Sequence, residues 1–438
     1  MATLNARAIR AMLAACLFYA AFGGLIQWFP IWLIEARGFT GEQLGLVISI
    51  AGIGRIIAGP LTSAWADGRR DRRAPIQLLA AITLMALGGL WVSNSFGISF
   101  ALAFAVEVTF WALIAFLEAA LLRLCRPDAV PSYGVARGLA SLSFVVGNVA
   151  TGMLVDGDFN STPASDGGSG RVQRLVSAFA MVLKAVLEPI HKLGIVLGFE
   201  PGSGMILWWL MLTVFGLLTA SVTMAAEPVA RVAQPPFAQR LAQGFAMVKR
   251  PEFALLMFGC GLIQAGHQFY YIFGTKLWID ELGVSATAAG WLFAFGVIVE
   301  ALFLMLVAPR IEHVRPATLM LIGGLGALAR WSLMATSPTL TLLVPLQALH
   351  AVSFACTFLG AMRGIQLLWG DDRTPTAQMM FMALATAPAQ ALSSWIAGRV
   401  FDTGVGSQGY VAMLAPVAVG TVLVFLLWRR PEPTAVAG

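Results

Sequence analysis

Long runs of apolar residues alternate with short polar or charged segments along almost the whole chain. Six runs lie at residues 11–34, 43–66, 75–95, 97–122, 133–155 and 204–226, and six more lie at 252–275, 285–308, 316–336, 339–365, 376–400 and 409–428. An α-helix needs about 20 mostly apolar residues to cross the hydrocarbon core of a bilayer. The pattern therefore predicts an all-α membrane protein with twelve transmembrane helices in two sets of six.

Two segments interrupt this alternation and set the expected boundaries. Residues 1–156 would form the first five spans, 203–226 the sixth span, and 251–438 the second bundle. Residues 227–250 are rich in proline and basic side chains, which indicates a cytosolic linker. The insertion 157–202 opens with a Gly- and Ser-rich stretch and continues as an apolar segment broken by charges, which predicts an amphipathic helix on the outer surface. A thirteenth span is the alternative, and it would invert the second bundle.

Basic residues are distributed unevenly between the two predicted sides of the membrane. With both termini in the cytoplasm, 19 of the 28 Lys and Arg residues fall on the cytoplasmic side, seven fall on the outer side, and two lie inside spans. Cytoplasmic loops carry an excess of Lys and Arg. We therefore expect a multi-pass protein of the cytoplasmic (inner) membrane with both termini inside the cell.

Composition narrows the classes of function. The chain is 58% hydrophobic and 11% charged, whereas about a quarter of the residues of a soluble domain are charged. The net charge of +6 comes from clusters at the ends of spans, so we expect no nucleic-acid partner. The four cysteines stand apart, and the sequence has no metal-ligand spacing, nucleophile elbow or phosphate loop. Neither an enzyme nor a cofactor is expected.

Ionisable residues within the spans are the candidate functional residues, because such groups are costly in hydrocarbon and usually face a wet cavity or a partner. They are Arg55 in span two, Glu107 and Glu118 in span four, His267 in span seven, Glu300 in span eight, Arg330 in span nine and His350 in span ten. Glu107 and Glu118 are eleven residues apart, about three helical turns, so they share one helix face. We expect these charges to line a common aqueous pocket.

Glu300, Arg330 and His350 come from three successive spans and combine an acid, a fixed cation and a titratable base. Arg330 could bind a substrate carboxylate or hold Glu300 ionised, and partial desolvation would let Glu300 accept a proton near neutral pH. Proton uptake would weaken the hold of Glu300 on Arg330 and so couple protons to substrate.

Each candidate also has a structural interpretation. Glu300 and Arg330 could form an ion pair that only fixes helix packing. Arg55 could extend to the membrane interface or pair with Glu107. His267 and His350 could be simple interhelical hydrogen-bonding or packing groups. Function is favoured because charge within a membrane is usually functional.

Several stretches resemble a transporter family. Asp67, Arg69 and Arg70 follow span two in a loop similar to the Gly-x-x-x-Asp and basic motif of the major facilitator superfamily, although Ser63 replaces the first glycine. The equivalent loop of the second half, at 308–310, lacks the aspartate. More specific likeness, to the phenylpropionate-permease group related to oligosaccharide and nucleoside proton symporters, lies in segments 133–144, 267–300 and 330–354. The resemblance covers nearly the whole chain except 157–202.

The resemblance implies two pseudo-symmetric six-helix halves, alternating access, and a site near the bilayer midplane. It implies that Glu118 and Arg137 bind substrate and that Glu300, Arg330 and His350 match the corresponding charged groups of the related sugar symporter. That symporter has a proton-carrying glutamate where this chain has Ser353. Glu300 therefore becomes the expected proton acceptor.

We expect a monomeric secondary transporter that imports a small organic solute together with protons. An aromatic or other carboxylate is favoured, because Arg55 and Arg330 offer cationic anchors. The expected substrate-binding residues are Glu118, Arg137, Arg330, Arg55, Glu107 and His267, the proton-coupling residues are Glu300 and His350, and the gating loop holds Asp67, Arg69 and Arg70. Export by proton antiport is the alternative. A membrane-embedded enzyme, a channel or a scaffold fits less well with two matched halves and midplane charges.

Overall fold

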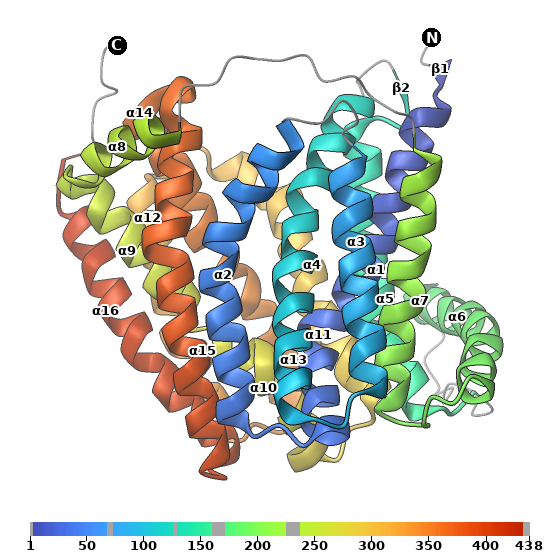
Figure 1. Cartoon of the computed structure of the whole chain (residues 1–438). Helices are drawn as coiled ribbons and strands as arrows, with labels where there is room; N and C mark the ends of the chain where they lie inside the picture. Colours follow the sequence, from blue (N-terminus) through green and yellow to red (C-terminus); the bar gives the residue numbers. More distant parts are fainter. Residues whose placement is uncertain (1–2, 68–72, 126–128, 160–170, 225–236, 432–438) are drawn as a thin grey trace. The chain divides into compact units, whose positions relative to one another are not determined.

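The computed structural model describes residues 3–67, 73–125, 129–159, 171–224 and 237–431. Nearly all of them are helical (Figure 1). The strands found in these ranges are β1 (Thr3–Leu4) and β2 (Ala129–Val130), which pair in parallel. This short ladder ties the start of the chain to the segment that precedes the fifth span.

Each apolar run of the first half forms a helix close to the expected bounds. These helices are α1 (Ala6–Arg37), α2 (Gly41–Asp67), α3 (Ala74–Val92), α4 (Phe96–Leu124), α5 (Tyr133–Asp156) and α7 (Gly204–Thr223). Local signals set their ends: the Asn5 side chain accepts from the backbone amides of Arg7 and Ala8, and Gly38 ends α1 in the left-handed conformation (φ 64°).

The second half is helical too, but several of its spans contain wider or tighter turns. Its helices are α9 (Pro251–Ala265), α10 (Gln268–Leu282), α11 (Ala286–Leu302), α12 (Pro316–Met334), α13 (Leu340–His350), α14 (Thr357–Met380), α15 (Ala387–Asp402) and α16 (Tyr410–Trp428). Turns of π-helix lie at η1 (Phe303–Val307), η3 (Ala351–Cys356) and η4 (Phe381–Thr386), and 3₁₀ turns at η2 (Ala308–Ile311) and η5 (Gly406–Gly409).

Ten helical segments of the described ranges are long and apolar enough to cross a membrane. The two remaining expected spans, 252–275 and 376–400, are also helical but interrupted. The first breaks between α9 and α10 at Gly266 and His267, and the second consists of the end of α14, η4 and α15. The hydropathy pattern therefore locates these helices correctly and does not reveal their breaks.

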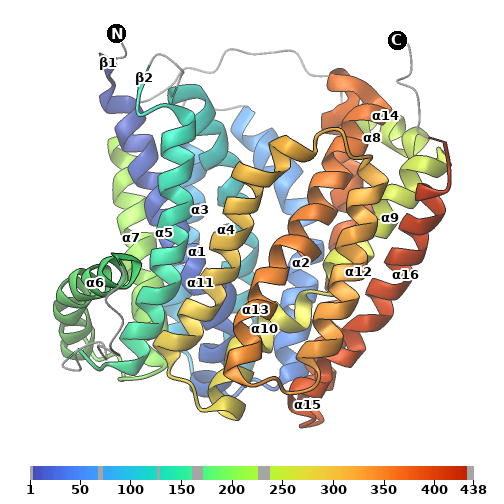
Figure 2. The ribbon, with the colours of Figure 1, turned by 180° about the vertical axis from the view of Figure 1, so that it is seen from behind.

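The insertion and the linker each contain a helix. In the insertion, α6 (Arg171–Val196) follows residues 160–170, which lie outside the described part of the chain, and α6 is not among the ten apolar segments. In the linker, α8 (Phe237–Val248) follows residues 225–236, which are likewise outside it. Figure 2 shows α6 beside α5 and α7.

The chain divides into two compact units that do not follow its two halves. Unit 1 comprises Met1–Phe39, Arg73–Ala226 and Trp278–Ala294, and unit 2 comprises Thr40–Arg72, Glu227–Leu277 and Phe295–Gly438. The second span, α2, thus packs with helices of the second half, and the start of α11 packs with helices of the first half.

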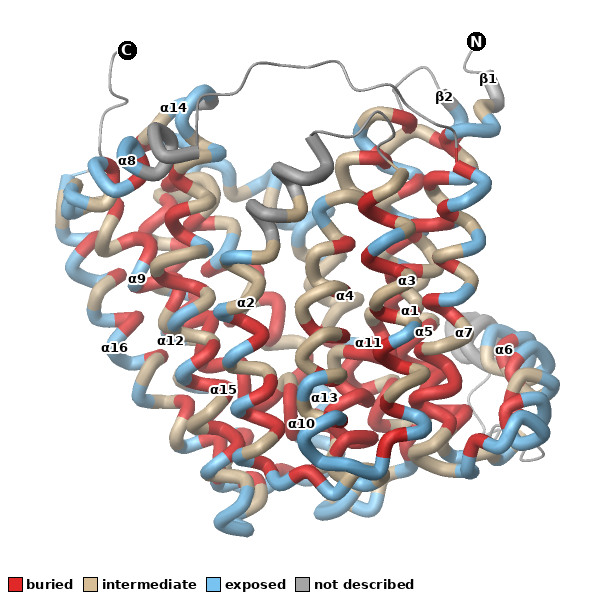
Figure 3. The backbone as a smooth tube through the Cα atoms, viewed as in Figure 1, coloured by how far each residue is buried: buried red, intermediate tan, exposed pale blue. Residues whose placement is uncertain are grey.

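Close helix crossings in each unit depend on glycine. In unit 1, a Cβ on Gly147 of α5 would collide with the Ala20 carbonyl of α1. In unit 2, a Cβ on Gly398 of α15 would collide with the Gly41 carbonyl of α2. Small residues let membrane helices approach backbone to backbone, where lipid gives no hydrophobic drive for association. Figure 3 shows how buried and exposed positions alternate along the helices.

Candidate functional site

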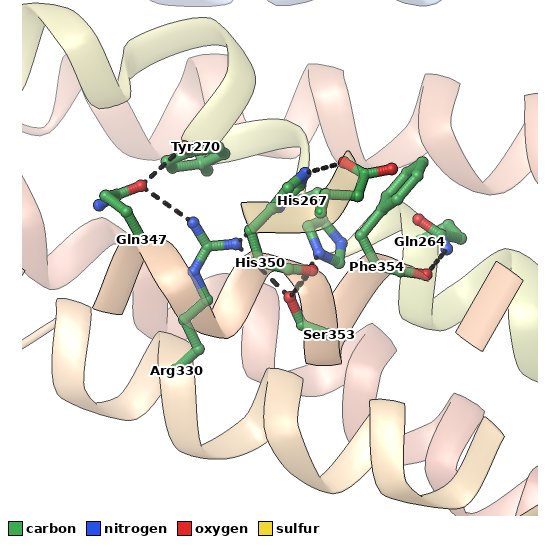
Figure 4. A network of polar contacts seen from close by, with 9 residues as sticks. Gln264, His267, Tyr270, Arg330, Gln347, His350, Ser353 and Phe354 are labelled. Carbon is green, nitrogen blue, oxygen red and sulfur yellow. Dashed lines mark hydrogen bonds and ion pairs between the residues drawn. The ribbon is translucent and has the colours of Figure 1, made fainter. Parts of the chain in front are cut away.

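The buried charges of unit 2 meet in one network of polar contacts (Figure 4). Arg330 comes from α12, Gln347 and His350 from α13, Ser353 from the π-turn η3, and His267 from the break between α9 and α10. Glu300 comes from α11, one turn after Gly296, where a Cβ would lie 3.2 Å from the Gln347 carbonyl oxygen. This close approach of α11 to α13 brings the Glu300 carboxylate to His350. Turns of π-helix often mark functional sites.

Arg330 is fully buried at 0% exposure. Its guanidinium donates from Nη1 to His350 Nδ1 at 3.0 Å and to Ser353 Oγ at 3.5 Å, and from Nη2 to Gln347 Oε1 at 3.2 Å. The rings of Tyr270 and Trp331 lie 4.5 and 4.6 Å from its central carbon. Among the described residues, no carboxylate pairs with Arg330 directly. The buried cation is thus held by neutral groups and aromatic faces.

His350 stands between Arg330 and Glu300. Its Nε2 lies 3.3 Å from Glu300 Oε2, and the Glu300 side chain is 18% exposed. A guanidinium can only donate, so His350 Nδ1 must accept from Arg330, and the ring proton must sit on Nε2 and point to Glu300. The expected direct contact between Glu300 and Arg330 is therefore replaced by a relay of cation, neutral imidazole and carboxylate.

The site has more donors than acceptors. In the described part of the chain, Arg330 Nε, Gln347 Nε2 and Trp331 Nε1 are buried without a hydrogen-bond partner. The Gln347 orientation follows from its neighbours, because its Oε1 accepts from Tyr270 Oη at 2.8 Å as well as from Arg330. Buried donors normally have an acceptor. An acceptor-rich group is the chemical complement of this cluster.

His267 extends the network on its other side. Its Nδ1 lies 3.2 Å from the Ile263 carbonyl oxygen and its Nε2 lies 3.2 Å from Ser353 Oγ. Because the carbonyl only accepts, His267 carries its proton on Nδ1 and accepts the Ser353 hydroxyl at Nε2. Ser353 stands at the position where the related sugar symporter has a proton-carrying glutamate. Its hydroxyl therefore connects His267 to Arg330.

A second charged cluster lies in unit 1. Glu118 Oε1 accepts from Tyr19 Oη at 2.7 Å and pairs with Arg137 Nε at 3.0 Å, while Tyr133 Oη donates to Oε2 at 3.2 Å. Arg137 also donates to Ser141 Oγ at 2.7 Å and lies 4.7 Å from the Tyr19 ring. The side chains of Arg137 and Glu118 are 37% and 23% exposed. Glu118 and Arg137 therefore meet, as an ion pair open to solvent.

The remaining predicted site residues are Glu107, Arg55 and the residues of the gating loop. Glu107 is 8% exposed and accepts from Trp111 Nε1 at 3.1 Å. Arg55 is partly buried and donates to the Ala51 carbonyl of its own helix at 3.3 Å. Glu107 belongs to unit 1 and Arg55 to unit 2. For the gating loop, Asp67 ends α2, and Arg69 and Arg70 lie outside the described residues.

Two aspartates at helix ends have a role that the sequence did not reveal. Asp402, at the end of α15, accepts from the backbone amides of Gly41 at 2.6 Å and Glu42 at 2.8 Å, the first residues of α2. Asp156, at the end of α5, accepts from the amides of Ala286 at 2.9 Å and Thr287 at 2.8 Å, the first residues of α11. Each carboxylate thus caps a helix from the other half of the sequence.

Apolar helices that bury charged side chains among them are typical of multi-pass membrane transporters. The sequence matches the model of the MFS_1-like family over residues 11–411, and the chain belongs to that family. The expected fold, the major facilitator fold, and the expected family are confirmed. The family and the relatives named below are transporters, not enzymes.

Particular relatives span almost the same length. The chain is 22% identical over 390 residues to the probable 3-phenylpropionic acid transporter of Escherichia coli, covering 88% of this chain and 89% of that protein. It is 24% identical to the maltose permease of Geobacillus stearothermophilus, covering 96% and 94% of the two chains. The solved nucleoside transporter NupG matches with a TM-score of 0.75 at 15% identity, over 97% of this chain and 100% of that one. The solved D-xylose–proton symporter matches with a TM-score of 0.59 at 12% identity, over 97% of each chain.

Proposed function

We propose that this secondary transporter carries a small organic carboxylate together with one proton by alternating access. The observation that carries the proposal is the state of Arg330: a fully buried guanidinium with no carboxylate partner among the described residues and with orphaned donors around it. A substrate carboxylate offers both the charge and the acceptor oxygens that this cluster needs. Because Arg330 is shielded from solvent here, substrate must reach it in another state of the cycle.

Charge balance supports the coupling. With Glu300 ionised, Arg330 and Glu300 compensate each other through His350. A proton on Glu300 leaves one buried positive charge, which is costly away from water. An anionic substrate would restore neutrality, so proton and substrate favour each other's binding. His350 is a poor final proton acceptor, because a proton on Nδ1 would face the Arg330 donor. We assign the coupled proton to Glu300, with His350 as its partner.

The substrate class has independent support. One relative is named a probable 3-phenylpropionic acid transporter, and the rings of Tyr270 and Trp331 flank Arg330. An aromatic carboxylate is therefore the first candidate. The maltose permease relative makes maltose the comparison substrate. In unit 1, we propose that Glu118 and Arg137 bind polar groups of the substrate, since their ion pair is open to solvent.

The membrane orientation follows from the basic residues. We place both termini in the cytoplasm and the protein in the cytoplasmic membrane, because 19 of the 28 Lys and Arg residues then lie on the inner side. In this orientation the contacts of Asp156 and Asp402 lie at the outer ends of their spans.

The test is uptake of 3-phenylpropionate, benzoate and maltose into proteoliposomes that contain the purified protein. An inward proton gradient should drive carboxylate accumulation. A potassium diffusion potential should not, because one proton and one carboxylate carry no net charge. Glu300→Gln should lose the response to the proton gradient and keep exchange of labelled for unlabelled substrate, since glutamine mimics the protonated acid.

Glu188→Gln is the control, because Glu188 is an exposed acid on α6, paired with Lys192. It should respond as the unsubstituted protein does. Uptake of maltose but of no carboxylate would overturn the substrate assignment. Accumulation driven equally by the potential would overturn the one-to-one charge balance, and an unchanged proton response in Glu300→Gln would overturn the role of Glu300.

A further inference from the structure

Helix α6 (Arg171–Val196) lies next to α5 and α7 and runs across them (Figures 1 and 2). It is held against unit 1 by one stripe of side chains. Leu187 is 1% exposed, Leu183 is 8% exposed and His191 is 9% exposed. Trp208 of α7 donates from Nε1 to the Ile190 carbonyl at 3.0 Å. These contacts fix which side of α6 faces the protein.

A second stripe of α6 is apolar and uncovered. Val182 is 65% exposed, Val186 53%, Leu193 48% and Val196 81%. At about 100° per residue these positions form one line along the helix, roughly 120° around from the stripe that contacts the protein. An apolar stripe of this length facing water would be unfavourable.

The third side of α6 is polar. Lys184, Glu188 and Lys192 follow each other at intervals of four residues, and Lys192 Nζ pairs with Glu188 Oε1 at 2.7 Å. This polar stripe is short, because Met181 and Ile195 continue the same side of the helix at its two ends and are 56% and 44% exposed. It lies roughly 120° from each of the other two stripes. Helix α6 therefore has one side that packs against the protein, one side that is apolar and exposed, and one side that is polar.

The position of α6 identifies what covers the apolar side. Its contacts fall at the ends of two spans: His191 packs on Phe159, just after the end of α5, at 5.3 Å between ring centroids, and Trp208 stands near the start of α7. Phe199, which follows α6, stacks on Trp91 at the end of α3 at 4.7 Å. The ends of membrane spans lie at the boundary between acyl chains and lipid headgroups.

We propose that α6 lies in the membrane interface as a lipid-docking helix. Val182, Val186, Leu193 and Val196 enter the acyl-chain region, and Lys184, Glu188 and Lys192 stay among headgroups and water. An amphipathic helix in the plane of a bilayer buries its apolar face just below the headgroups. The lysine side chains can extend to lipid phosphates. The occupant of the apolar stripe is phospholipid, not a second protein.

The experiment places one cysteine at a time along α6 in the full-length protein, reconstituted in phosphatidylcholine vesicles. The sites are Val182→Cys and Val186→Cys on the apolar stripe, and Lys184→Cys and Glu188→Cys on the polar stripe as matched controls. Each is labelled with a bimane fluorophore. The natural cysteines are replaced by serine; labelling in the natural background, where Cys125, Cys260 and Cys356 are buried, is the second route.

Brominated phosphatidylcholine should quench the two apolar-stripe labels at least threefold more than the two polar-stripe labels, and aqueous iodide should show the opposite order. If iodide quenches position 186 as strongly as position 188, the stripe faces water and the proposal is wrong. If position 186 is shielded from both quenchers, and the shielding disappears as the protein is diluted in lipid, a second copy covers the stripe and the proposal is equally wrong. Neither outcome bears on carboxylate transport.

Discussion

Asp156 and Asp402 hold the first turns of α11 and α2, and replacing the two carboxylates gives a quantitative prediction. Asp156 and Asp402 each accept two backbone amides from the first turn of a helix in the other half of the sequence. In the proposed orientation both caps lie at the outer ends of their spans, and outward opening in the proposed cycle would break both contacts. Asp→Asn at either site keeps the shape and one acceptor oxygen, but it removes the charge that favours a helix N-terminus and replaces the second acceptor with an NH2 donor.

The expected magnitude follows from exposure. Both aspartates are exposed to solvent, so water screens the charge and can accept from the amide that loses its partner, and the loss per site stays within the surface range, about 0.7 kcal/mol. The two sites lie in different compact units, so their effects should add. The double variant should therefore shift the equilibrium by about 1.4 kcal/mol, or roughly tenfold toward the state open at this end. Each single variant should shift it about threefold.

The assay is pulsed electron paramagnetic resonance in lipid nanodiscs. Spin labels at Leu46→Cys of α2 and Val405→Cys after α15 are suitable, because both positions are exposed and neither belongs to a cap. The population with the longer distance is compared with the shorter one. Glu188→Gln, which removes an exposed acid that caps no helix, is the control. A double variant whose populations match those of the control would show that the caps do not hold this end closed.

The remaining predictions concern the two charged clusters and the glycine crossings. Tyr19→Phe removes a 2.7 Å hydrogen bond to a carboxylate and should weaken substrate binding by about 1.4 kcal/mol, or roughly tenfold, in equilibrium binding measurements; Tyr133→Phe, whose bond is 3.2 Å, should have the smaller effect, and the reverse order would contradict the geometry. Ser353→Ala should lower the unfolding free energy by about 1 kcal/mol and leave the proton response of uptake intact; loss of that response would move the proton path to Ser353. Gly398→Val should lower the free energy of unfolding in detergent by about 1–3 kcal/mol. Gly97→Val, where a Cβ meets open space, should not lower it. Equal losses in the two variants would show that the crossing of α15 and α2 is not tight.

Much of this architecture could be predicted from the sequence because lipid imposes simple rules. A run of about 20 apolar residues has to become a helix, since its backbone groups find no partner in hydrocarbon. Glu300, Arg330 and His350 were predicted to meet because each is costly alone in its span. The structure brings all three into one network.

What the sequence could not show depends on tertiary crossings. The order of the relay, with His350 between the two charges, depends on how closely α11 approaches α13 at Gly296. The caps join residues 130 and 361 positions apart along the chain, and no local pattern encodes such pairs. The pairing of α2 with α15 is equally hidden, because every span looks alike by hydropathy.

The tyrosines of the sequence mark both charged clusters. The chain has five tyrosines. Tyr19 and Tyr133 contact Glu118. The other three lie at the Arg330 network: Tyr270 faces Arg330, Tyr271 stacks on His267, and Tyr410 stacks on Trp331. In a chain this apolar, a scarce residue with one polar atom concentrates where polar partners are buried.

The interleaving of the two units has a consequence for biogenesis. The ribosome delivers α2 long before α15, whose Asp402 caps it from 361 residues downstream. Until α15 is inserted, Gly41 and Gly45 of α2 have no helix to pack against. The first backbone amides of α2 also lack the Asp402 carboxylate as an acceptor. An amino-terminal fragment ending after α7 would remain in that unfinished condition. Insertion of the second half therefore also completes the packing of the first half. A nascent chain that stalls midway should need a membrane chaperone to prevent its aggregation in the bilayer.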